Sequence, residues 1–335
     1  MRAIGLFLIL VLVSAVSAVA AEDDTKTLDR LFIEGVDAFK ASEWNTAMER
    51  FNQVLQAEPD HTGALNYRAQ VYIIRREFDK AMADIDRAIA LEPKQHRFAC
   101  TKGLIFEHLG NAEKALEWYT KALDLKGGFH ADSLTGRIAV YISLGEYAKA
   151  LDDCNWLAKH QKTASTAMLR GNVLLAMGNT EAAYWDYVAA SRLERLNAKP
   201  ILALGDFFLF HDVDLRQAIA YYTAAIEQFR DPPIARLRRG QAYTALEPPL
   251  FAAQALKDFT RYIELEPDEP DGYFERAQLY LGLDDRAKAL ADARAALERD
   301  PQNESSKKLL ERITAGTAPS HQEAMNPSHP EEERP

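Results

Sequence analysis

The sequence has little of several features that define common protein classes. It contains only two cysteines in 335 residues, Cys100 and Cys154, and they fall on different faces of different predicted helices, so we expect no disulfide. No long run of valine, isoleucine and threonine alternates with polar residues, which argues against a β-sheet core. The net charge of −10 lacks the basic excess that general nucleic-acid binding requires. We therefore expect no nucleic-acid partner.

Motifs for catalysis and metal binding are also missing. The sequence has no HExxH, no CxxC pair, no phosphate-binding glycine loop and no GxSxG. We therefore predict no cofactor, no metal ion and no enzyme activity. A hydrolase that uses carboxylates such as Asp206 is the least favoured alternative.

The two ends of the chain differ from the rest. Residues 1–20 have a positive start, an apolar run and a small-residue end, which is typical of a secretory signal peptide. Cleavage after Ala20 would leave a periplasmic or secreted protein with no integral membrane span, and the alternative is an N-terminal membrane anchor. We treat residues 21–27 as a linker. Residues 315–335 carry proline, serine and an acidic run with little apolar content, which predicts a disordered tail.

The stretch from Leu65 to Pro93 is repeated along the chain. It describes two amphipathic helices with small residues where they cross, Ala69 on the first helix and Ala81 twelve positions later on the second. The pattern recurs about every 34 residues, and about eight copies cover residues 28–303. The paired positions are Gly35 and Ala47, Ala69 and Ala81, Gly103 and Ala115, Ile138 and Ala150, Gly171 and Ala183, Gly205 and Ala218, Gly240 and Ala255, and Ala277 and Ala289.

Departures from the pattern have structural consequences. Ile138 is the one large residue at the first-helix position, so we expect its two helices to cross less closely. Extra residues occur in the repeat of Gly205 and, around Pro248-Pro249, in the repeat of Gly240, where they belong in the loop between the helices. We expect glycines to end first helices in the left-handed conformation, and prolines to end second helices. These glycines are Gly110, Gly145 and Gly178, and these prolines are Pro59, Pro93, Pro267 and Pro301.

These residues resemble the tetratricopeptide repeat family. The family has a small first-helix residue, a second-helix alanine, a large residue four positions later and a small one seven positions later, as in Ala69, Ala81, Ile85 and Ala88. The resemblance implies an all-α fold: a right-handed superhelical solenoid of about eight helix-turn-helix repeats over residues 28–303. A helix over residues 304–314 would cap the stack. The resemblance also implies core positions for Tyr72, Phe106, Tyr141, Tyr243 and Tyr280.

A regular pattern of arginines has a structural explanation. In most repeats an arginine or lysine precedes the first-helix small residue, and an aspartate follows the second-helix alanine by three positions. Where the arginine is replaced, at Lys102 and Leu204, so is the aspartate, and in the first repeat Glu34 and Arg50 exchange the signs. We therefore predict salt bridges within repeats and not a row of sites for anionic ligands. The pairs are Arg68 and Asp84, Arg137 and Asp153, Arg170 and Asp186, Arg239 and Asp258, and Arg276 and Asp292.

The resemblance also implies a ligand-binding groove lined by the first helices. Amide side chains there can bind a peptide backbone, and apolar ones can hold anchoring side chains. The lysine, asparagine and arginine clamp with which chaperone-binding members hold two carboxylates is not visible. The predicted groove residues are Asn66, Gln70, Ile73, Leu104, His108, Asn172, Leu175, Asp206, Gln241 and Gln278.

These observations favour a binding protein over an enzyme. Our hypothesis is a non-catalytic scaffold in the periplasm or secretory space that binds a protein or peptide segment in its groove and mediates complex assembly. The alternative is a structural protein of the cell envelope that self-associates or tethers through its convex face or its ends.

Overall fold

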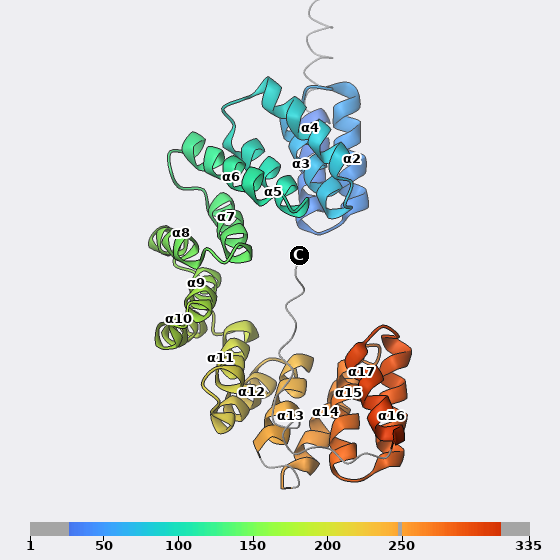
Figure 1. Ribbon diagram of the computed structural model, residues 1–335. Coiled ribbons are helices and arrows are strands. Elements are labelled where there is room, and N and C mark those ends of the chain that lie inside the picture. Colours follow the sequence, from blue (N-terminus) through green and yellow to red (C-terminus); the bar gives the residue numbers. More distant parts are fainter. Residues whose placement is uncertain (1–26, 247–249, 316–335) are drawn as a thin grey trace, which may run out of the picture. The chain divides into compact units, whose positions relative to one another are not determined.

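The computed structural model describes residues 27–246 and 250–315 (Figure 1). The predicted signal peptide, the predicted tail after residue 315 and the inserted Pro248-Pro249 therefore lie outside the described residues. The helices pack into two bodies, an N-terminal body that ends at Leu157 and a C-terminal body that begins at Ala158.

The N-terminal body contains the first four helix pairs. Its first helix covers residues 27–40. The helices that follow are α2 (Trp44–Ala57), α3 (Thr62–Ile74), α4 (Phe78–Leu91), α5 (His96–His108), α6 (Ala112–Lys126), α7 (Ala131–Ser143) and α8 (Tyr147–His160), whose last turn crosses the division. From α2 to α7 each helix contacts the next, and the first helices α3, α5 and α7 also contact one another in sequence.

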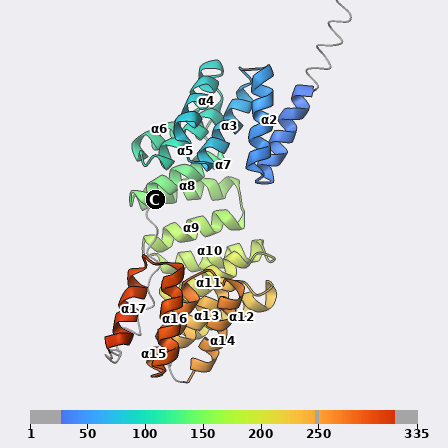
Figure 2. The same cartoon turned by 90° about the vertical axis from the view of Figure 1, so that its right-hand side faces the viewer.

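The C-terminal body contains four further helix pairs and one terminal helix. Its helices are α9 (Ala164–Ala176), α10 (Thr180–Leu193), α11 (Ala198–Phe210), α12 (Leu215–Gln228), α13 (Pro233–Leu246), α14 (Ala252–Leu265), α15 (Asp271–Gly282), α16 (Arg286–Arg299) and α17 (Glu304–Ala315). The helix α17 packs on α15 and α16, where Leu309 and Ile313 are buried (Figure 2).

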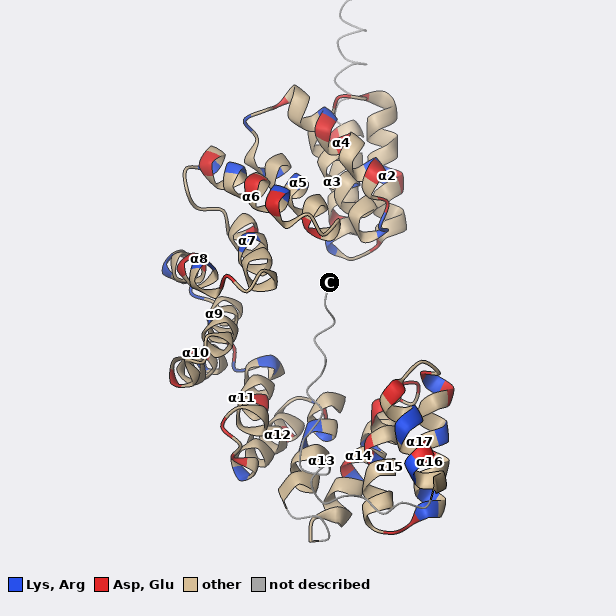
Figure 3. Ribbon diagram, viewed as in Figure 1, with Lys and Arg blue, Asp and Glu red and all other residues tan. Residues whose placement is uncertain are grey.

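The prediction of an all-α repeat fold is confirmed, because the described residues form paired helices and no strand. Acidic and basic residues are interspersed along α6 and along α16 and α17 (Figure 3). None of the described helices has the length and apolar character that a membrane crossing requires. The right-handed course of the whole stack stays a prediction.

The predicted helix ends are confirmed. Gly110, Gly145 and Gly178 follow first helices with φ of +70°, +71° and +79°. Glycine adopts this conformation at little steric cost, whereas Ser42, Arg76 and Asp284 take it after other first helices at φ of +62°, +59° and +61°. Second helices end two residues before a proline, as α4 does at Leu91.

One side chain fills the crossing of the two helices in each repeat. It stands four positions after the second-helix alanine, and it is aromatic wherever the first helix carries glycine. A Cβ on Gly205, for example, would lie 2.5 Å from Cε1 of Tyr222. The pairs are Gly35 and Phe51, Gly103 and Tyr119, Gly171 and Tyr187, Gly205 and Tyr222, and Gly240 and Phe259. Glycine is thus required at these crossings to make room for a ring.

Where the first helix carries a larger residue, the side chain at the second position is smaller. Ala69 is matched with Ile85, and both are fully buried in one core cluster. Ile138 is matched with Cys154, which is also buried. The side-chain sizes at the two crossing positions are therefore complementary, and the large Ile138 is accommodated by the small Cys154.

The prediction that five first-helix aromatic residues belong to the core holds for its edge, because Tyr72, Phe106, Tyr243 and Tyr280 pack against the core clusters. These rings are only partly buried, and a cation from the same repeat lies over each one. The distances from cation to ring centroid are 5.5 Å for Lys80 and Tyr72, 5.2 Å for Lys114 and Phe106, 5.5 Å for Lys149 and Tyr141, 5.9 Å for Arg239 and Tyr243, and 5.2 Å for Lys288 and Tyr280. The long aliphatic stems of these cations can cover the ring while the charge stays in water.

Candidate functional site

The structure brings together all five predicted pairs of arginine and aspartate. Arg68 donates from Nε and Nη2 to the two carboxylate oxygens of Asp84, at 2.7 and 2.8 Å. The other four pairs, Arg137 with Asp153, Arg170 with Asp186, Arg239 with Asp258, and Arg276 with Asp292, have the same two-bond geometry. In the first repeat Arg50 Nε lies 3.0 Å from a carboxylate oxygen of Glu34.

The same arginines also bind the preceding repeat, which the sequence analysis did not anticipate. Nη1 of four of them donates to a polar side chain 16 or 17 positions earlier in the chain. The acceptors are Asn52 for Arg68, Thr120 for Arg137, Thr223 for Arg239 and Thr260 for Arg276. Because the guanidinium donors are used within the protein, these arginines join neighbouring repeats and are poorly placed to bind an anionic ligand.

Lys102 corrects one part of the charge pattern. Within its own repeat it has no acidic partner, because Trp118 stands where other repeats carry the aspartate. In the structure Lys102 Nζ lies 2.5 Å from Asp86, in the preceding repeat, and 4.3 Å from the centroid of the Trp118 ring. The acidic partner comes from a different repeat, so a comparison within one repeat could not find it.

In the N-terminal body, the predicted groove residues are only partly available to a ligand. Ile73 is 5% exposed and belongs to the hydrophobic core, so its assignment to the groove is wrong. Asn66 is 6% exposed, and its Oδ1 accepts a hydrogen bond from Thr101 Oγ1 at 2.7 Å. Gln70 and Leu104 are half-buried. His108 is exposed at the C-terminal end of α5.

In the C-terminal body, second-helix tyrosines hold two of the predicted groove residues. Tyr187 Oη donates to Asn172 Oδ1 at 2.8 Å, and Tyr222 Oη donates to Asp206 Oδ1 at 2.6 Å. The rings reach these acceptors by passing the crossing glycines, which carry no Cβ to block them. These hydrogen bonds from the second helix therefore fix the side chains of Asn172 and Asp206 on the first helix. Leu175 is half-buried and Gln278 is exposed.

Gln241 is part of a polar network and is not open to a ligand, which corrects its assignment to the groove. It is 8% exposed, accepts from Arg238 Nη1 at 3.0 Å and donates to Glu275 Oε1 at 2.7 Å. Arg238 Nε lies 3.8 Å from Asp206 Oδ1. The network therefore links α11, α13 and α15.

Burial sets the electrostatics of this network. It raises the pKa of Asp206, against the opposing effects of the Tyr222 hydroxyl and of Arg238. Burial also raises the pKa of Glu275, against the hydrogen bond from Gln241. Because the polar groups of the network largely satisfy one another, we assign it a structural role. Among the described residues, no group of three or more His, Cys, Asp or Glu side chains is placed to hold a metal ion.

The two cysteines are free thiols, as expected. Cys154 is buried, and Cys100 is partly buried. Burial raises the pKa of the Cys100 thiol to about 11, against a hydrogen bond with Ser133. Because thiolates and not thiols are nucleophilic, Cys100 is a poor nucleophile.

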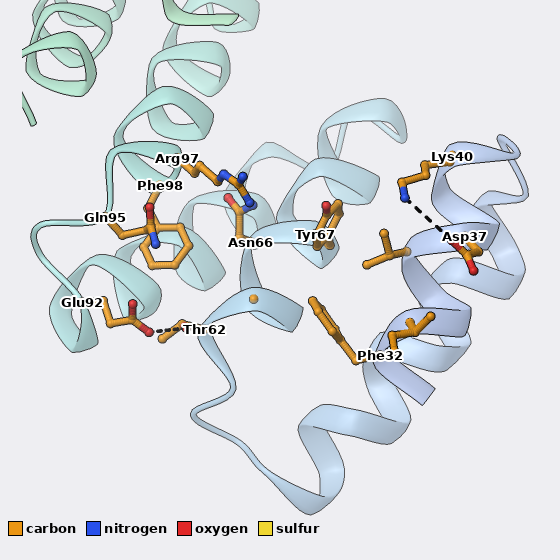
Figure 4. Close-up of a pocket in the computed structure, with 13 residues that line it drawn as sticks. Phe32, Asp37, Lys40, Thr62, Asn66, Tyr67, Glu92, Gln95, Arg97 and Phe98 are labelled. Carbon is orange, nitrogen blue, oxygen red and sulfur yellow. Dashed lines mark hydrogen bonds and ion pairs between the residues drawn. The ribbon is translucent and has the colours of Figure 1, made fainter. Parts of the chain in front are cut away.

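A cavity of about 430 Å³ lies in the N-terminal body, between the helix over residues 27–40, α3 and the start of α5 (Figure 4). Aromatic side chains from all three helices contribute to its wall, namely Phe32, Tyr67 and Phe98. Ile33 and Val36 add aliphatic surface, and Ile33 is 57% exposed. The remaining lining residues are Asp37, Lys40, Thr62, Gly63, Asn66, Glu92, Gln95 and Arg97.

Two of the four charged side chains at this cavity form an ion pair with each other. Asp37 lies 3.8 Å from Lys40, and Glu92 accepts a hydrogen bond from Thr62 at 2.5 Å. Arg97 is exposed, and within the described part of the chain no carboxylate forms an ion pair with it. Figure 4 shows the Arg97 side chain extending along the cavity toward Asn66. Glu92 likewise forms no ion pair with a described cation, so the cavity combines apolar walls with one unpaired positive and one unpaired negative side chain.

Of the ten predicted groove residues, only Asn66 lines this cavity. The predicted groove residues lie within about one turn of the crossing residue of each first helix. Gln95, Arg97 and Phe98 lie in the first turn of α5, further from the crossing at Gly103. Extending the helical period by one more turn toward the N-terminus would have included them.

Comparison with known proteins identifies the fold. A solved structure of a tetratricopeptide repeat protein from Parabacteroides merdae superposes with a TM-score of 0.52, at 18% identity, over 86% of this chain and 99% of that one. A family model described as tetratricopeptide repeat matches residues 270–303, which contain α15 and α16. The chain belongs to the tetratricopeptide repeat family. A model of the auxiliary subunit of N-terminal acetyltransferase A also matches, over residues 17–170.

Other tetratricopeptide repeat proteins show how far the similarity extends. The Hsp70-Hsp90 organizing protein of Triticum aestivum is 27% identical over 231 residues, which are 57% of this chain and 39% of that protein. The chain thus spans about two fifths of the length of this curated relative. The APC/C hetero-tetramer Cut9-Hcn1 matches with a TM-score of 0.55, at 15% identity, over 84% of this chain and 55% of the compared one. At these identities the solved structures establish the fold alone.

Proposed function

We propose that this tetratricopeptide repeat protein is a non-catalytic scaffold that binds a protein or peptide segment in the cavity of its N-terminal body. One observation carries the proposal: an open cavity with three aromatic walls contains an arginine that no described carboxylate neutralises. Binding sites typically combine apolar walls with a few polar groups that fix orientation.

The lining favours a segment with an apolar anchor next to an acidic group. An apolar side chain would pack between Phe32 and Phe98, and a carboxylate would bind the guanidinium of Arg97. Gln95 supplies an amide suited to the backbone of an extended segment, whereas Asn66 has only its Nδ2 to donate, because its Oδ1 accepts from Thr101. Asp37 and Glu92 also line the cavity, so the contact with an acidic side chain would be local to the guanidinium of Arg97.

The proposed role is to bring proteins together in the periplasm or secretory space. The Hsp70-Hsp90 organizing proteins similar to this chain are named for bringing two other proteins into one assembly, which supports the scaffold role. The location is supported by the signal-like residues 1–20. Amino-terminal sequencing of the protein from its native host tests it: a mature chain that starts at Ala21 is expected, and a chain that retains residues 1–20 would contradict a cleaved signal.

Selection from a random peptide library tests the binding function. We expect the wild-type protein to enrich peptides with an apolar residue beside an acidic one. Arg97→Glu and Ile33→Glu, both at exposed positions, should abolish the enrichment. Arg192→Glu makes the same charge change at an exposed position outside the cavity and should leave it intact. No enrichment on the wild type, or the same enrichment on all variants, would contradict the proposal.

Self-association is the second candidate, and exposed apolar side chains favour it. In the C-terminal body Trp185 is 56% exposed and Leu196 is 96% exposed. Large exposed apolar side chains can take part in contacts between proteins, although single ones are common on surfaces. Light scattering across concentrations separates the candidates: a constant monomer mass opposes self-association, and a mass that rises to a multiple and falls with Trp185→Glu supports it.

A further inference from the structure

Two histidine rings meet at the wall of the cavity. His96 is the first residue of α5, His130 directly precedes α7, and their ring centroids lie 4.7 Å apart in an edge-to-face arrangement. Both residues are half-buried. His96 stands between Gln95 and Arg97, which line the cavity. The contact therefore joins the cavity wall to the next repeat.

The hydrogen bond from the backbone to His130 requires an unprotonated Nδ1. His130 Nδ1 accepts from the backbone N–H of Ser133 at 3.4 Å and so caps the N-terminus of α7. It also lies 2.8 Å from Ser133 Oγ. A protonated Nδ1 carries a hydrogen and can no longer accept, so protonation removes this cap. It would also place a positive charge at the positive end of the helix dipole.

Burial and the surrounding charges lower the pKa values of His96 and His130, with one exception. Burial lowers the pKa of His96, and the neighbouring His130, Lys126 and Arg97 lower it further. Burial also lowers the pKa of His130, where Lys126 and Arg97 add to the effect. Only Asp132, which is 3.8 Å from His130 Nε2 and highly exposed, opposes it. In the folded protein both histidine rings are thus favoured in their neutral form.

We propose that His96 and His130 form an acid-sensitive joint between α5 and α7, and that their protonation loosens the cavity wall that carries Gln95, Arg97 and Phe98. Two imidazolium rings in contact would repel each other and also Arg97 and Lys126. The first turns of α5 and α7 would separate, and the shape of the cavity would change. The effect on ligand binding rests on the proposed function, whereas the loosening of the joint does not.

Amide hydrogen exchange of the full chain without ligand tests the joint. The measurement compares about pH 7.5 with about pH 5.5, a range that spans the ordinary titration of histidine, after correction for intrinsic rates. We expect exchange in the first turns of α5 and α7 to rise at least about fivefold at the lower pH, because these turns open locally. Unchanged corrected exchange in the wild type would overturn the proposal.

Three variants identify the groups responsible. His130→Asn retains a side chain that caps helices and does not titrate here, so it should lose the acid response. His96→Gln keeps the His130 cap and removes the second charge, so it should lose most of the response. His61→Asn changes the corresponding cap of α3, where the neighbouring ring is Phe32, and should keep the response. A full acid response in both His130→Asn and His96→Gln would overturn the proposal, as would its loss in His61→Asn alone.

Discussion

Tyr222 Oη donates a hydrogen bond to Asp206 Oδ1 at 2.6 Å, from the second helix of a repeat to the first. The bond exists because Gly205 leaves space for the ring: a Cβ there would lie 2.5 Å from Tyr222 Cε1. The same combination joins Gly171, Tyr187 and Asn172. One small residue at the crossing therefore determines both how the helices pack and how a first-helix polar group is held.

The first prediction concerns this crossing. Gly205→Ala should destabilise the protein by about 1–3 kcal/mol, because the added methyl group overlaps the Tyr222 ring and forces it to move. Gly282→Ala is the matched control, since nothing lies within 4 Å of a Cβ at the end of α15. That variant should be neutral or more stable by up to about 1 kcal/mol. Urea denaturation measures the free energy of unfolding of both variants. Equal changes would refute the role of Gly205 in making room for the Tyr222 ring.

The second prediction concerns the exchange of volume between the two crossing positions. Ile85→Phe should cost about 1–3 kcal/mol, because Ala69 leaves no space for a ring. Adding Ala69→Gly recreates the glycine–aromatic pair found in other repeats, so the double variant should be more stable than the sum of the single effects implies. A double-mutant cycle by urea denaturation measures the coupling. Strict additivity would show that the two positions fill the crossing independently.

The third prediction concerns the most buried ion pair. Asp258 is 1% exposed and accepts hydrogen bonds from Arg236 and Arg239. Asp258→Asn should destabilise the protein by about 3–5 kcal/mol, because it leaves the largely buried guanidinium of Arg239 without a counter-charge, whereas Arg236 keeps Asp231. The control is Glu264→Gln, in an exposed pair with Arg261, where the change should stay within about 1 kcal/mol. Similar losses in thermal unfolding for both variants would contradict this account.

The fourth prediction concerns pH. Because burial raises the pKa of Glu275, the folded state binds its proton more tightly than the unfolded state does. Its contribution to stability is therefore present at low pH and is lost as pH rises through the raised pKa. Glu275→Gln removes the titrating group and can still accept from Gln241.

The variant should therefore be more stable than the wild type at neutral pH, and this advantage should vanish as pH falls below about 4, the ordinary carboxyl range. Glu298→Gln changes an exposed carboxylate on α16 and should show no such pH-dependent difference. Unfolding free energies across this range provide the measurement. A variant that is less stable at neutral pH would show that the Glu275 charge is favourable in the folded state.

Much of the fold could be predicted from the sequence, because the spacing of small residues depends only on local helix geometry. Gly103 and Ala115 are positioned by the period of a helix pair, and Arg137 and Asp153 by their offsets from it. The candidate site was less predictable, since the exposure of a side chain to a ligand depends on which neighbouring repeats cover it. Ile73 has the spacing of a groove residue and yet lies in the core, because adjacent repeats cover it.

The cavity depends on three helices from three repeats, so no single repeat contains its pattern. Phe32, Asn66 and Arg97 come from three successive first helices and are far apart in the sequence. Likewise, the pairing of Lys102 with Asp86 crosses from one repeat to the preceding one. A period establishes what recurs within a repeat, whereas these contacts arise from how repeats stack.

The affinity of a library-selected peptide for the wild type and for Arg97→Glu tests the central claim most directly. Calorimetry on the full chain should show at least about a tenfold rise in Kd for Arg97→Glu, equivalent to about 1.4 kcal/mol. The melting temperature should not change, because Arg97 is exposed and forms no ion pair with a described carboxylate. Equal Kd values for the two proteins would contradict binding in this cavity.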